Sequence, residues 1–314
     1  MSDKIITELL GVEKNVLLKN FTTYKIGGPA KYFFVAKTKE NLVKALESAK
    51  KFKLPVFILG GGSNVLIFEK GFKGLVIKID ISDYKINGNK VVVESGINIT
   101  KLAYLTADCG LSGLEWAAGM PGTVGGAIYG SAQAFGTRIS DLVESVEAIN
   151  LKSLKIRNFT KKQCGFSIKN SIFKKSKQLV IVLAILKLEN KDKEDIKNKI
   201  KEFLEYRRTK HPMDFPSAGS VFVNPEKVGL KIIKKYPELE YFLKKGPLPA
   251  GYLIAKCGLA GKKIGQAQIS EKHANFIINL GEAKSNDVLA LINLAKKEVK
   301  KTFNINLETE VQIF

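Results

Sequence analysis

The chain has 314 residues, 45% of them hydrophobic and 26% charged, and a formal net charge of +21. This composition supports real hydrophobic cores and two, at most three, domains, so it excludes a disordered or low-complexity protein. Most of the charge comes from lysines spread from end to end, since only four of the 51 basic residues are arginines. We therefore expect attraction for small anions rather than a dedicated nucleic-acid surface, and no nucleic-acid partner.

Cysteines and histidines are too few and too scattered for a disulfide framework or a metal site, so we expect no metal. The three cysteines are Cys109, Cys164 and Cys257, and the two histidines are His211 and His273. The first ten residues contain acidic side chains and no long apolar stretch, unlike a signal peptide. The longest apolar run, 179–186, is far shorter than a membrane span. We expect a cytoplasmic protein with no membrane partner.

The first two thirds of the chain mix helical and strand patterns. Residues 40–52 place apolar side chains at helical spacing, and Pro55 ends that pattern. A second helix is predicted at 102–109, with Gly110 as its cap. Apolar and β-branched runs predict strands at 56–59, 75–79, 90–94, 143–149, 155–159 and 179–188. This part of the chain is therefore α+β in character.

The last third follows a charged amphipathic helix predicted at 193–207. A loop with two prolines is predicted next, at 209–219, so we place a domain boundary between 205 and 210. Helices are predicted at 228–235 and 286–301, the second capped by Ser285 or Asn286. Strands are predicted at 275–279 and 306–314.

Two glycine-rich loops carry the strongest functional signal: LGGGSNVL at 59–66 and GMPGTVGG at 119–126. Glycine lets backbone N–H groups approach a ligand closely, so each loop can surround a phosphate. Neither is a standard nucleotide motif, because Val65 replaces the third glycine of a G-x-G-x-x-G and no Gly-Lys-Ser/Thr follows. Together they predict binding of a dinucleotide's pyrophosphate, with two ordinary tight turns as the alternative.

Several long segments, in the right order, resemble the UDP-N-acetylenolpyruvoylglucosamine reductase family, and the compact layout resembles its shorter class. The segments are TTYKIGGPA at 22–30, LGGGSNVLI at 59–67, GMPGTVGGAIYG at 119–130, PSAGSVFVNP at 216–225, ISEKHANFIIN at 269–279 and LETEVQIF at 307–314. The resemblance implies an α+β fold with an FAD-binding domain of the vanillyl-alcohol-oxidase (PCMH) type. That domain would occupy 1–205, in two subdomains divided near residue 80. A smaller α+β substrate-binding domain would occupy 206–314, its C-terminal strand at 306–314 returning to the active site.

The activity implied is the NADPH-dependent, FAD-mediated reduction of UDP-N-acetylglucosamine enolpyruvate to UDP-N-acetylmuramate in peptidoglycan precursor synthesis. FAD would be held noncovalently, NADPH would be the co-substrate, and the protein would be a monomer. Three alternatives stay open. They are a flavin-dependent oxidase of a sugar or alcohol, an inactive flavin-binding protein, and a basic nucleic-acid-binding protein.

The resemblance assigns the cofactor contacts to the two glycine loops and the residues that follow them. The residues expected to contact FAD are Gly60, Gly61, Gly62, Ser63, Asn64, Val65, Gly119, Pro121, Gly122, Thr123, Gly125, Gly126 and Ile128.

Three catalytic residues are also implied. Ser220 matches the acid that protonates the carbon next to the one receiving hydride. Glu310 matches a catalytic glutamate that protonates or orients the reacting groups. Lys169 stands where the family pattern has an arginine, so it keeps the positive charge and loses the planar fork. Ile168 stands where that pattern has a tyrosine.

The substrate contacts implied are Lys210, Asn224 and Arg207. Arg207 and Lys210 lie at the predicted domain boundary, and Asn224 follows it. A second departure from the family pattern follows the second glycine loop, where Ser131 and Gln133 replace the usual asparagine and glycine.

Overall fold

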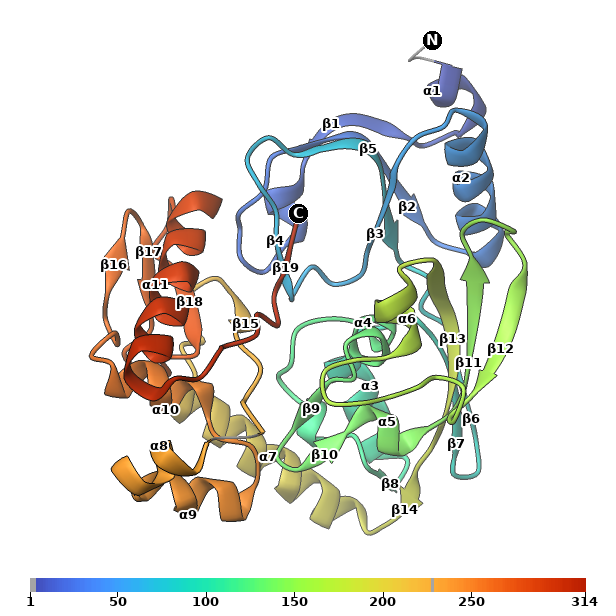
Figure 1. Cartoon of the computed structure of the whole chain (residues 1–314). Helices are drawn as coiled ribbons and strands as arrows, with labels where there is room; N and C mark the ends of the chain where they lie inside the picture. The colour runs from blue at the N-terminus through green and yellow to red at the C-terminus, as the bar shows by residue number, and fades with distance from the viewer. Residues whose placement is uncertain (1–3, 227–228) are drawn as a thin grey trace. The chain divides into compact units, whose positions relative to one another are not determined.

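The computed structural model describes residues 4–226 and 229–314. Figure 1 labels its helices and strands in chain order. The chain forms two compact units: Met1–Val16 with Pro29–Gly61 and Phe72–Arg207, and Leu17–Gly28 with Gly62–Gly71 and Arg208–Phe314. Among the described residues, none of the helices is both long and apolar enough to cross a membrane.

The two units do not follow a single cut of the sequence near 205. The short segments Leu17–Gly28 and Gly62–Gly71 belong with the C-terminal part of the chain. The reason is direct backbone pairing: β4 (Val65–Leu66) pairs in parallel with β19 (Gln312–Ile313). In addition, the Thr23 hydroxyl donates a hydrogen bond to the Ser217 carbonyl at 2.7 Å.

The first unit contains a four-stranded sheet in the order β1 (Glu13–Leu17), β2 (Pro29–Ala36), β5 (Phe72–Ile79), β3 (Val56–Leu59). Strands β2, β5 and β3 run parallel, and α2 (Lys39–Lys51) connects β2 to β3. Helix α2 begins after Thr38, whose side chain accepts a hydrogen bond from the Asn41 N–H at 3.1 Å. The helix packs its buried leucine and alanine stripe against β2 and β5.

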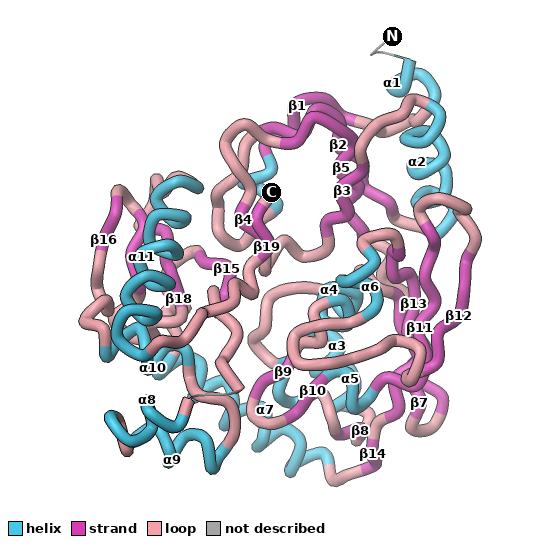
Figure 2. The backbone as a smooth tube through the Cα atoms, viewed as in Figure 1, coloured by secondary structure: helices cyan, strands magenta, loops and turns pink. Residues whose placement is uncertain are grey.

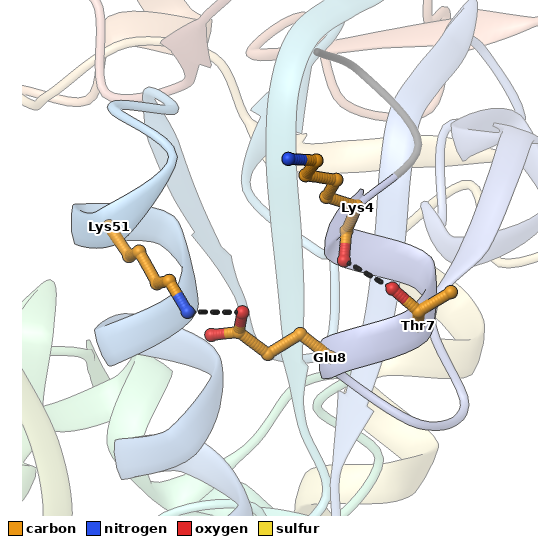
Figure 3. Close-up of polar contacts among 4 residues, drawn as sticks. All are labelled: Lys4, Thr7, Glu8 and Lys51. Atoms are coloured by element: carbon orange, nitrogen blue, oxygen red, sulfur yellow. Dashed lines mark hydrogen bonds and ion pairs between the residues drawn. The ribbon is translucent and has the colours of Figure 1, made fainter.

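A short N-terminal helix, α1 (Lys4–Glu8), buries Ile5 in the core that α2 shares with the parallel sheet. Glu8 forms an ion pair with Lys51 of α2, as Figure 3 shows. Within α1 the Thr7 hydroxyl donates to the Lys4 carbonyl at 2.9 Å. The pair is exposed, so it orients α1 more than it stabilises the unit.

The second sheet of this unit has five strands in the order β12 (Ile156–Thr160), β11 (Val143–Asn150), β13 (Leu179–Lys187), β7 (Lys90–Glu94), β6 (Tyr84–Asn87). All neighbouring strands are antiparallel. Its core is shared with α3 (Ile99–Asp108) and α4 (Val124–Tyr129). The remaining elements are β8 (Leu111–Ser112), the 3-10 helix η2 (Glu115–Ala117), β9 (Gln133–Ala134), β10 (Thr137–Arg138), α5 (Ile139–Leu142), α6 (Ile172–Ser176), β14 (Glu189–Asn190) and α7 (Lys193–Lys210).

The second unit is built on a four-stranded antiparallel sheet in the order β15 (Ser217–Ser220), β18 (Phe276–Asn279), β17 (Ala267–Ile269), β16 (Lys263–Ile264). Its core is formed mainly with α10 (Ala250–Lys256) and α11 (Ser285–Phe303). The other helices are η1 (Leu18–Phe21), α8 (Leu230–Lys235) and α9 (Glu238–Lys245). Residue 228, the first of the helix predicted at 228–235, lies outside the described residues.

Two predicted elements of the C-terminal third are wrong in extent. The loop predicted at 209–219 is shorter, because α7 continues to Lys210 and β15 begins at Ser217. The strand predicted at 306–314 is limited to β19, as Figure 2 shows. Before β19 the chain meets a different partner, because the Val223 N–H donates to the Glu308 carbonyl at 2.9 Å. At β19 itself the Gln312 N–H donates to the Asn64 carbonyl at 3.1 Å.

The N-terminus of α11 is capped by its own Asp287, which accepts a hydrogen bond from the Lys284 N–H at 3.0 Å, and also from a distant segment. Ser285 is the first helical residue, and its backbone N–H donates to the Glu69 carboxylate at 2.6 Å. The Ser285 hydroxyl donates to the other carboxylate oxygen of Glu69. Desolvation on burial raises the pKa of Glu69. The two hydrogen bonds from Ser285, its own backbone and the charge of Lys284 together lower it, and the pKa lies below its ordinary 4.5. An anion at a helix N-terminus is also favoured by the helix dipole.

Substituting Glu69→Gln tests this cap. The pKa of Glu69 is lower in the folded chain than in the unfolded chain, so its contribution is fully present above the unfolded pKa and is lost as the pH falls through the folded one. We expect the variant to lose about 1 kcal/mol of unfolding free energy at neutral pH, a modest figure because solvent screens this exposed side chain. In urea unfolding the difference from the parent should shrink below the ordinary glutamate pKa of 4.5. A difference independent of pH would contradict the assignment.

Candidate functional site

The two glycine loops touch each other through their backbones inside the first unit. A Cβ added to Gly61 would lie 2.5 Å from the Gly122 Cα, and a Cβ added to Gly60 would lie 2.9 Å from the Thr123 hydroxyl oxygen. Real Cβ contacts are essentially never shorter than 3.0 Å. Only glycine therefore fits at 61, and the two loops, 60 residues apart in the chain, form one surface.

Backbone N–H groups on this surface are unused. Within residues 4–226 and 229–314, the N–H groups of Gly60, Gly61, Gly122 and Thr123 donate no hydrogen bond to the chain. Backbone donors that are half-buried or buried normally have a partner. In the second unit the same is true of the N–H groups of 62–64. Such clusters of free backbone donors favour an anion and fit the pyrophosphate of FAD.

Other residues predicted to contact the cofactor have packing roles. The Gly125 N–H donates to the Ser95 carbonyl at 2.8 Å, and an added Cβ there would lie 2.7 Å from the Ser95 Cβ. The Gly126 N–H donates to the Thr123 hydroxyl at 3.2 Å, so Thr123 caps α4. The Ile128 side chain is fully buried in the core of the five-stranded sheet, and Val65 is buried in β4. Their side chains support the loops from behind. Of the remaining two predicted contacts, Pro121 is exposed and Gly119 is half-buried.

Arg207 was predicted to bind substrate, and the structure places it elsewhere. Its side chain is 7% exposed and lies under the second glycine loop. Its Nε donates to the Ala118 carbonyl at 3.0 Å and its Nη2 to the Trp116 carbonyl at 2.7 Å, and the guanidinium packs over the Phe135 ring. Burial lowers the pKa of the guanidinium, which stays protonated. The prediction is wrong because the fork is committed to the loop backbone.

Ser220 and Glu310 come together in the second unit. Ser220 ends β15, and the next residue, Val221, accepts a hydrogen bond from the Glu310 N–H at 2.8 Å. Within the described part of the chain the Ser220 hydroxyl makes no hydrogen bond. The Asn64 side-chain nitrogen donates to the Glu310 carbonyl at 3.3 Å, so the far half of the first glycine loop is tied to the same segment. The backbone pairing therefore holds Ser220 and Glu310 on neighbouring segments of the second unit.

Lys169 lies in a tight turn of the first unit. Ser167 and Asn170 pair across the turn, and Lys169 adopts a left-handed backbone conformation with φ 54°. Lys174 donates to the Lys169 carbonyl at 2.9 Å. The Ser171 hydroxyl donates to the Tyr129 carbonyl at 2.7 Å, which attaches this turn to the end of α4. The turn that carries Lys169 is thereby attached to the helix that follows the second glycine loop.

The two other predicted substrate residues lie in the second unit. Lys210 is exposed at the C-terminal end of α7. The Asn224 side-chain oxygen accepts a hydrogen bond from the Ala250 N–H at 3.0 Å, so it caps α10. Only the amide nitrogen of Asn224 is therefore left as a donor for a ligand. The described residues contain no group of three or more ligands able to hold a metal ion.

Sequence reasoning missed the role of Arg207 beneath the glycine loop and that of Ser95 behind Gly125. One signal was present for Arg207. In this chain lysine outnumbers arginine by 47 to 4 (51 basic residues less four arginines), so a retained arginine marks a place where the fork matters. Ser95 carried no such signal, because its contact is made by backbone atoms.

Known protein families match residues in both units of the chain. The profile of the UDP-N-acetylenolpyruvoylglucosamine reductase C-terminal domain matches residues 211–314, and that of an FAD binding domain matches 30–155. The reductase of that name from Caldicellulosiruptor bescii is 41% identical over 307 residues, covering 96% of this chain and 91% of the relative. The Bacillus subtilis reductase is 36% identical over 318 residues, covering 99% and 98%. The chain belongs to the UDP-N-acetylenolpyruvoylglucosamine reductase family.

A solved member of the reductase family shares the fold. The crystal structure of the Thermus caldophilus reductase superposes with a TM-score of 0.77 at 31% identity, covering 96% of this chain and 98% of that one. The predicted α+β class, with an FAD-binding domain of the vanillyl-alcohol-oxidase type, is confirmed. FAD as the cofactor of this family member is likewise confirmed, and the free N–H groups of the two loops fit it.

Arg207→Met tests the support beneath the second glycine loop. The variant leaves the Trp116 and Ala118 carbonyls without their charged donor, so we expect a loss of about 3 kcal/mol in unfolding free energy. Because the loop loses its brace, we also expect FAD to bind ~10-fold more weakly, which is about 1.4 kcal/mol. Flavin retained through gel filtration and urea unfolding measure both effects. The control is Arg157→Met, which removes an exposed arginine over the Phe159 ring and should keep its flavin. Equal flavin loss in the two variants would refute the brace.

Proposed function

We propose that this chain reduces UDP-N-acetylglucosamine enolpyruvate to UDP-N-acetylmuramate, with noncovalently held FAD as its cofactor and NADPH as its co-substrate. The reaction adds a hydride and a proton across the enolpyruvyl double bond while NADPH is oxidised. The observation that carries the proposal is the contact between two glycine loops with unused N–H groups, in a member of this reductase family. The chain is an FAD-dependent oxidoreductase of peptidoglycan precursor synthesis.

The chain holds the cofactor through backbone donors. When bound, FAD would supply the hydride-transfer chemistry between NADPH and the substrate. The N–H groups of Gly60, Gly61, Gly122 and Thr123 are the donors we assign to its pyrophosphate. Neither loop contains a cysteine or histidine, so neither can attach the flavin covalently. Acid precipitation should therefore leave the flavin in solution.

Ser220 is the proton donor in this proposal. Hydride addition leaves negative charge on the enolate, and a proton must reach the adjacent carbon. A serine hydroxyl is a weak acid, so it transfers its proton only to a strongly basic carbon placed close to it. Among the described residues the Ser220 hydroxyl has no hydrogen-bond partner, and the residue after it pairs with Glu310, which supports its assignment as the donor.

Lys169 and Glu310 support the same step. The developing anion is stabilised most by a fixed cation in a site closed to water, and we assign that cation to Lys169. Lysine supplies a point charge, without the bidentate fork that an arginine gives to a carboxylate. Glu310 orients the reacting groups and returns a proton to Ser220.

The nucleotide end of the substrate is assigned to the second unit. Lys210 is exposed and can meet a phosphate, and the amide nitrogen of Asn224 can donate beside it. We further propose that the enzyme works in the cytoplasm, where NADPH and nucleotide-activated sugars are made. We also propose that the protein is a monomer.

The proposed function is tested by NADPH oxidation with and without the enolpyruvyl substrate. The purified protein should be yellow and should oxidise NADPH in a one-to-one ratio with substrate. Oxygen consumption without NADPH oxidation would indicate an oxidase, and a yellow protein inert to both compounds would indicate an inactive flavin-binding protein. A colourless protein with strongly salt-dependent DNA affinity would indicate a nucleic-acid-binding protein.

Ser220→Ala separates the two halves of the reaction. The hydroxyl is needed only after hydride has left the flavin, so reduction by NADPH should keep its parental rate. Reoxidation by substrate should slow by about 10²–10⁴-fold, the usual effect of losing a general acid. Stopped-flow absorbance of the flavin measures each half-reaction alone. Reoxidation at the parental rate would exclude Ser220 as the donor.

A further inference from the structure

The strand end that carries Ser220 is irregular. In the pairing of β15 with β18, Ser217 is opposite Ile278 and Ser220 is opposite Phe276, so the register shifts between these two pairs. Gly219, inside this bulge, has a φ of 73°. A bulge disrupts the local ladder of hydrogen bonds and re-aims the next side chain. The direction of the Ser220 hydroxyl therefore depends on what holds the chain after the bulge.

The side chain of Asn275 holds the chain that follows the bulge. The Phe222 N–H donates to the Asn275 Oδ1 at 2.9 Å, and the Asn275 Nδ2 donates to the Phe222 carbonyl at 2.9 Å. The Asn275 backbone carbonyl also accepts from the Val221 N–H at 2.8 Å. Asn275 is 3% exposed. Its primary amide thus makes the two hydrogen bonds that a neighbouring strand would otherwise make with Phe222.

The opposite edge of the same segment meets the C-terminal chain. The Val221 carbonyl accepts from the Glu310 N–H at 2.8 Å, and the Val223 N–H donates to the Glu308 carbonyl at 2.9 Å. Residues 221–223 are therefore fixed on one side by Asn275 and on the other by the segment that carries Glu310. Moving this stretch would change the separation of Ser220 and Glu310.

We propose that Asn275 is a positioning residue that sets the Ser220 hydroxyl for proton delivery. This inference rests on the proposed function of Ser220. Only asparagine has a donor and an acceptor at this reach, since aspartate lacks the donor and glutamine is one methylene longer. A misplacement of about 1 Å at a reacting group can cost on the order of 10²-fold in rate.

A matched control lies four residues along the same stretch. Asn279 is 1% exposed, its Nδ2 donates to the Tyr24 carbonyl at 3.0 Å, and its Oδ1 accepts from the Gly281 and Ala283 N–H groups at 2.8 and 2.9 Å. Changing either asparagine to aspartate removes one buried donor to a backbone carbonyl and keeps the acceptor. The two variants should lose similar stability, but only Asn275→Asp alters the segment next to Ser220.

The experiment compares Asn275→Asp with Asn279→Asp in the flavin-loaded enzyme. At pH about 8 we expect reoxidation by the enolpyruvyl substrate to slow by ~10–100-fold in Asn275→Asp, with NADPH reduction and substrate affinity nearly unchanged. Asn279→Asp should stay within about twofold of the parent in reoxidation. Parental reoxidation in Asn275→Asp, or equal slowing in both variants, would overturn the proposal.

The pH profile gives a second readout. Once protonated, the carboxyl group introduced by Asn275→Asp can donate to the Phe222 carbonyl again, so the rate of this variant relative to the parent should recover as the pH falls. The titratable groups nearest to this residue are His273, whose Nδ1 accepts from the Asn275 N–H at 3.2 Å, and His211, whose ring packs against His273. Burial lowers the pKa of His273. Both histidines are present in the parent, and the pH profile of the parent shows their own titration. A ratio independent of pH would count against the proposal.

Two further measurements distinguish failure of this proposal from failure of the proposed function of Ser220. In the Ser220→Ala background, Asn275→Asp should have little additional effect, because the group it positions is gone. If Ser220→Ala alone reoxidises at the parental rate, the proposed role of Ser220 fails whatever Asn275 does. If Asn275→Asp does not retain flavin, Asn275→Gln replaces it, and parental reoxidation in that variant would overturn the proposal.

Discussion

The approach of two backbones at Gly61 and Gly122 is the constraint on which the first unit's site depends. At this contact there is no room for a side chain, because an added Cβ on Gly61 would lie 2.5 Å from the Gly122 Cα. The two loops therefore cannot separate without loss of the surface that they form, and they cannot close further. Their N–H groups are left unused by the chain in the described residues. Backbone donors that the chain does not use itself are available to a bound anion.

Much of the surrounding structure keeps this contact in place. The parallel sheet delivers the first loop at the end of β3, and α4 follows the second loop with Thr123 as its cap. From below, the Arg207 fork holds the Trp116 and Ala118 carbonyls, which come just before Gly119. A lysine could not replace it, since one ammonium group does not reproduce two N–H donors in a plane. The buried charge is thus explained by support of a loop rather than by contact with substrate.

In the second unit, asparagine side chains hold irregular backbone in place. Asn275 completes the pairing that the bulge at Gly219 interrupts, Asn64 holds the Glu310 carbonyl, and Asn279 holds the Tyr24 carbonyl. Each amide replaces hydrogen bonds that a regular strand would supply, where the chain must change partner. This explains why the C-terminal segment is not one long strand: its residues pair in turn with Val223, Val221 and Asn64. Side-chain hydrogen bonds thereby fix the irregular backbone next to Ser220 and Glu310, the residues assigned to proton transfer.

The sequence by itself determined the family, the α+β class, most helices and strands of the first unit, and the two glycine loops. These follow from local periodicity and from contiguous motifs, which survive without knowledge of contacts. Tertiary structure alone decided that Gly61 and Gly122 touch, that Glu69 rather than Ser285 caps α11, and that Arg207 turns into the protein. Each of these depends on atoms brought together from positions at least 60 residues apart in the chain. Spacing in a sequence carries no information on which distant carbonyl a side chain will meet, so those roles became visible only in the fold.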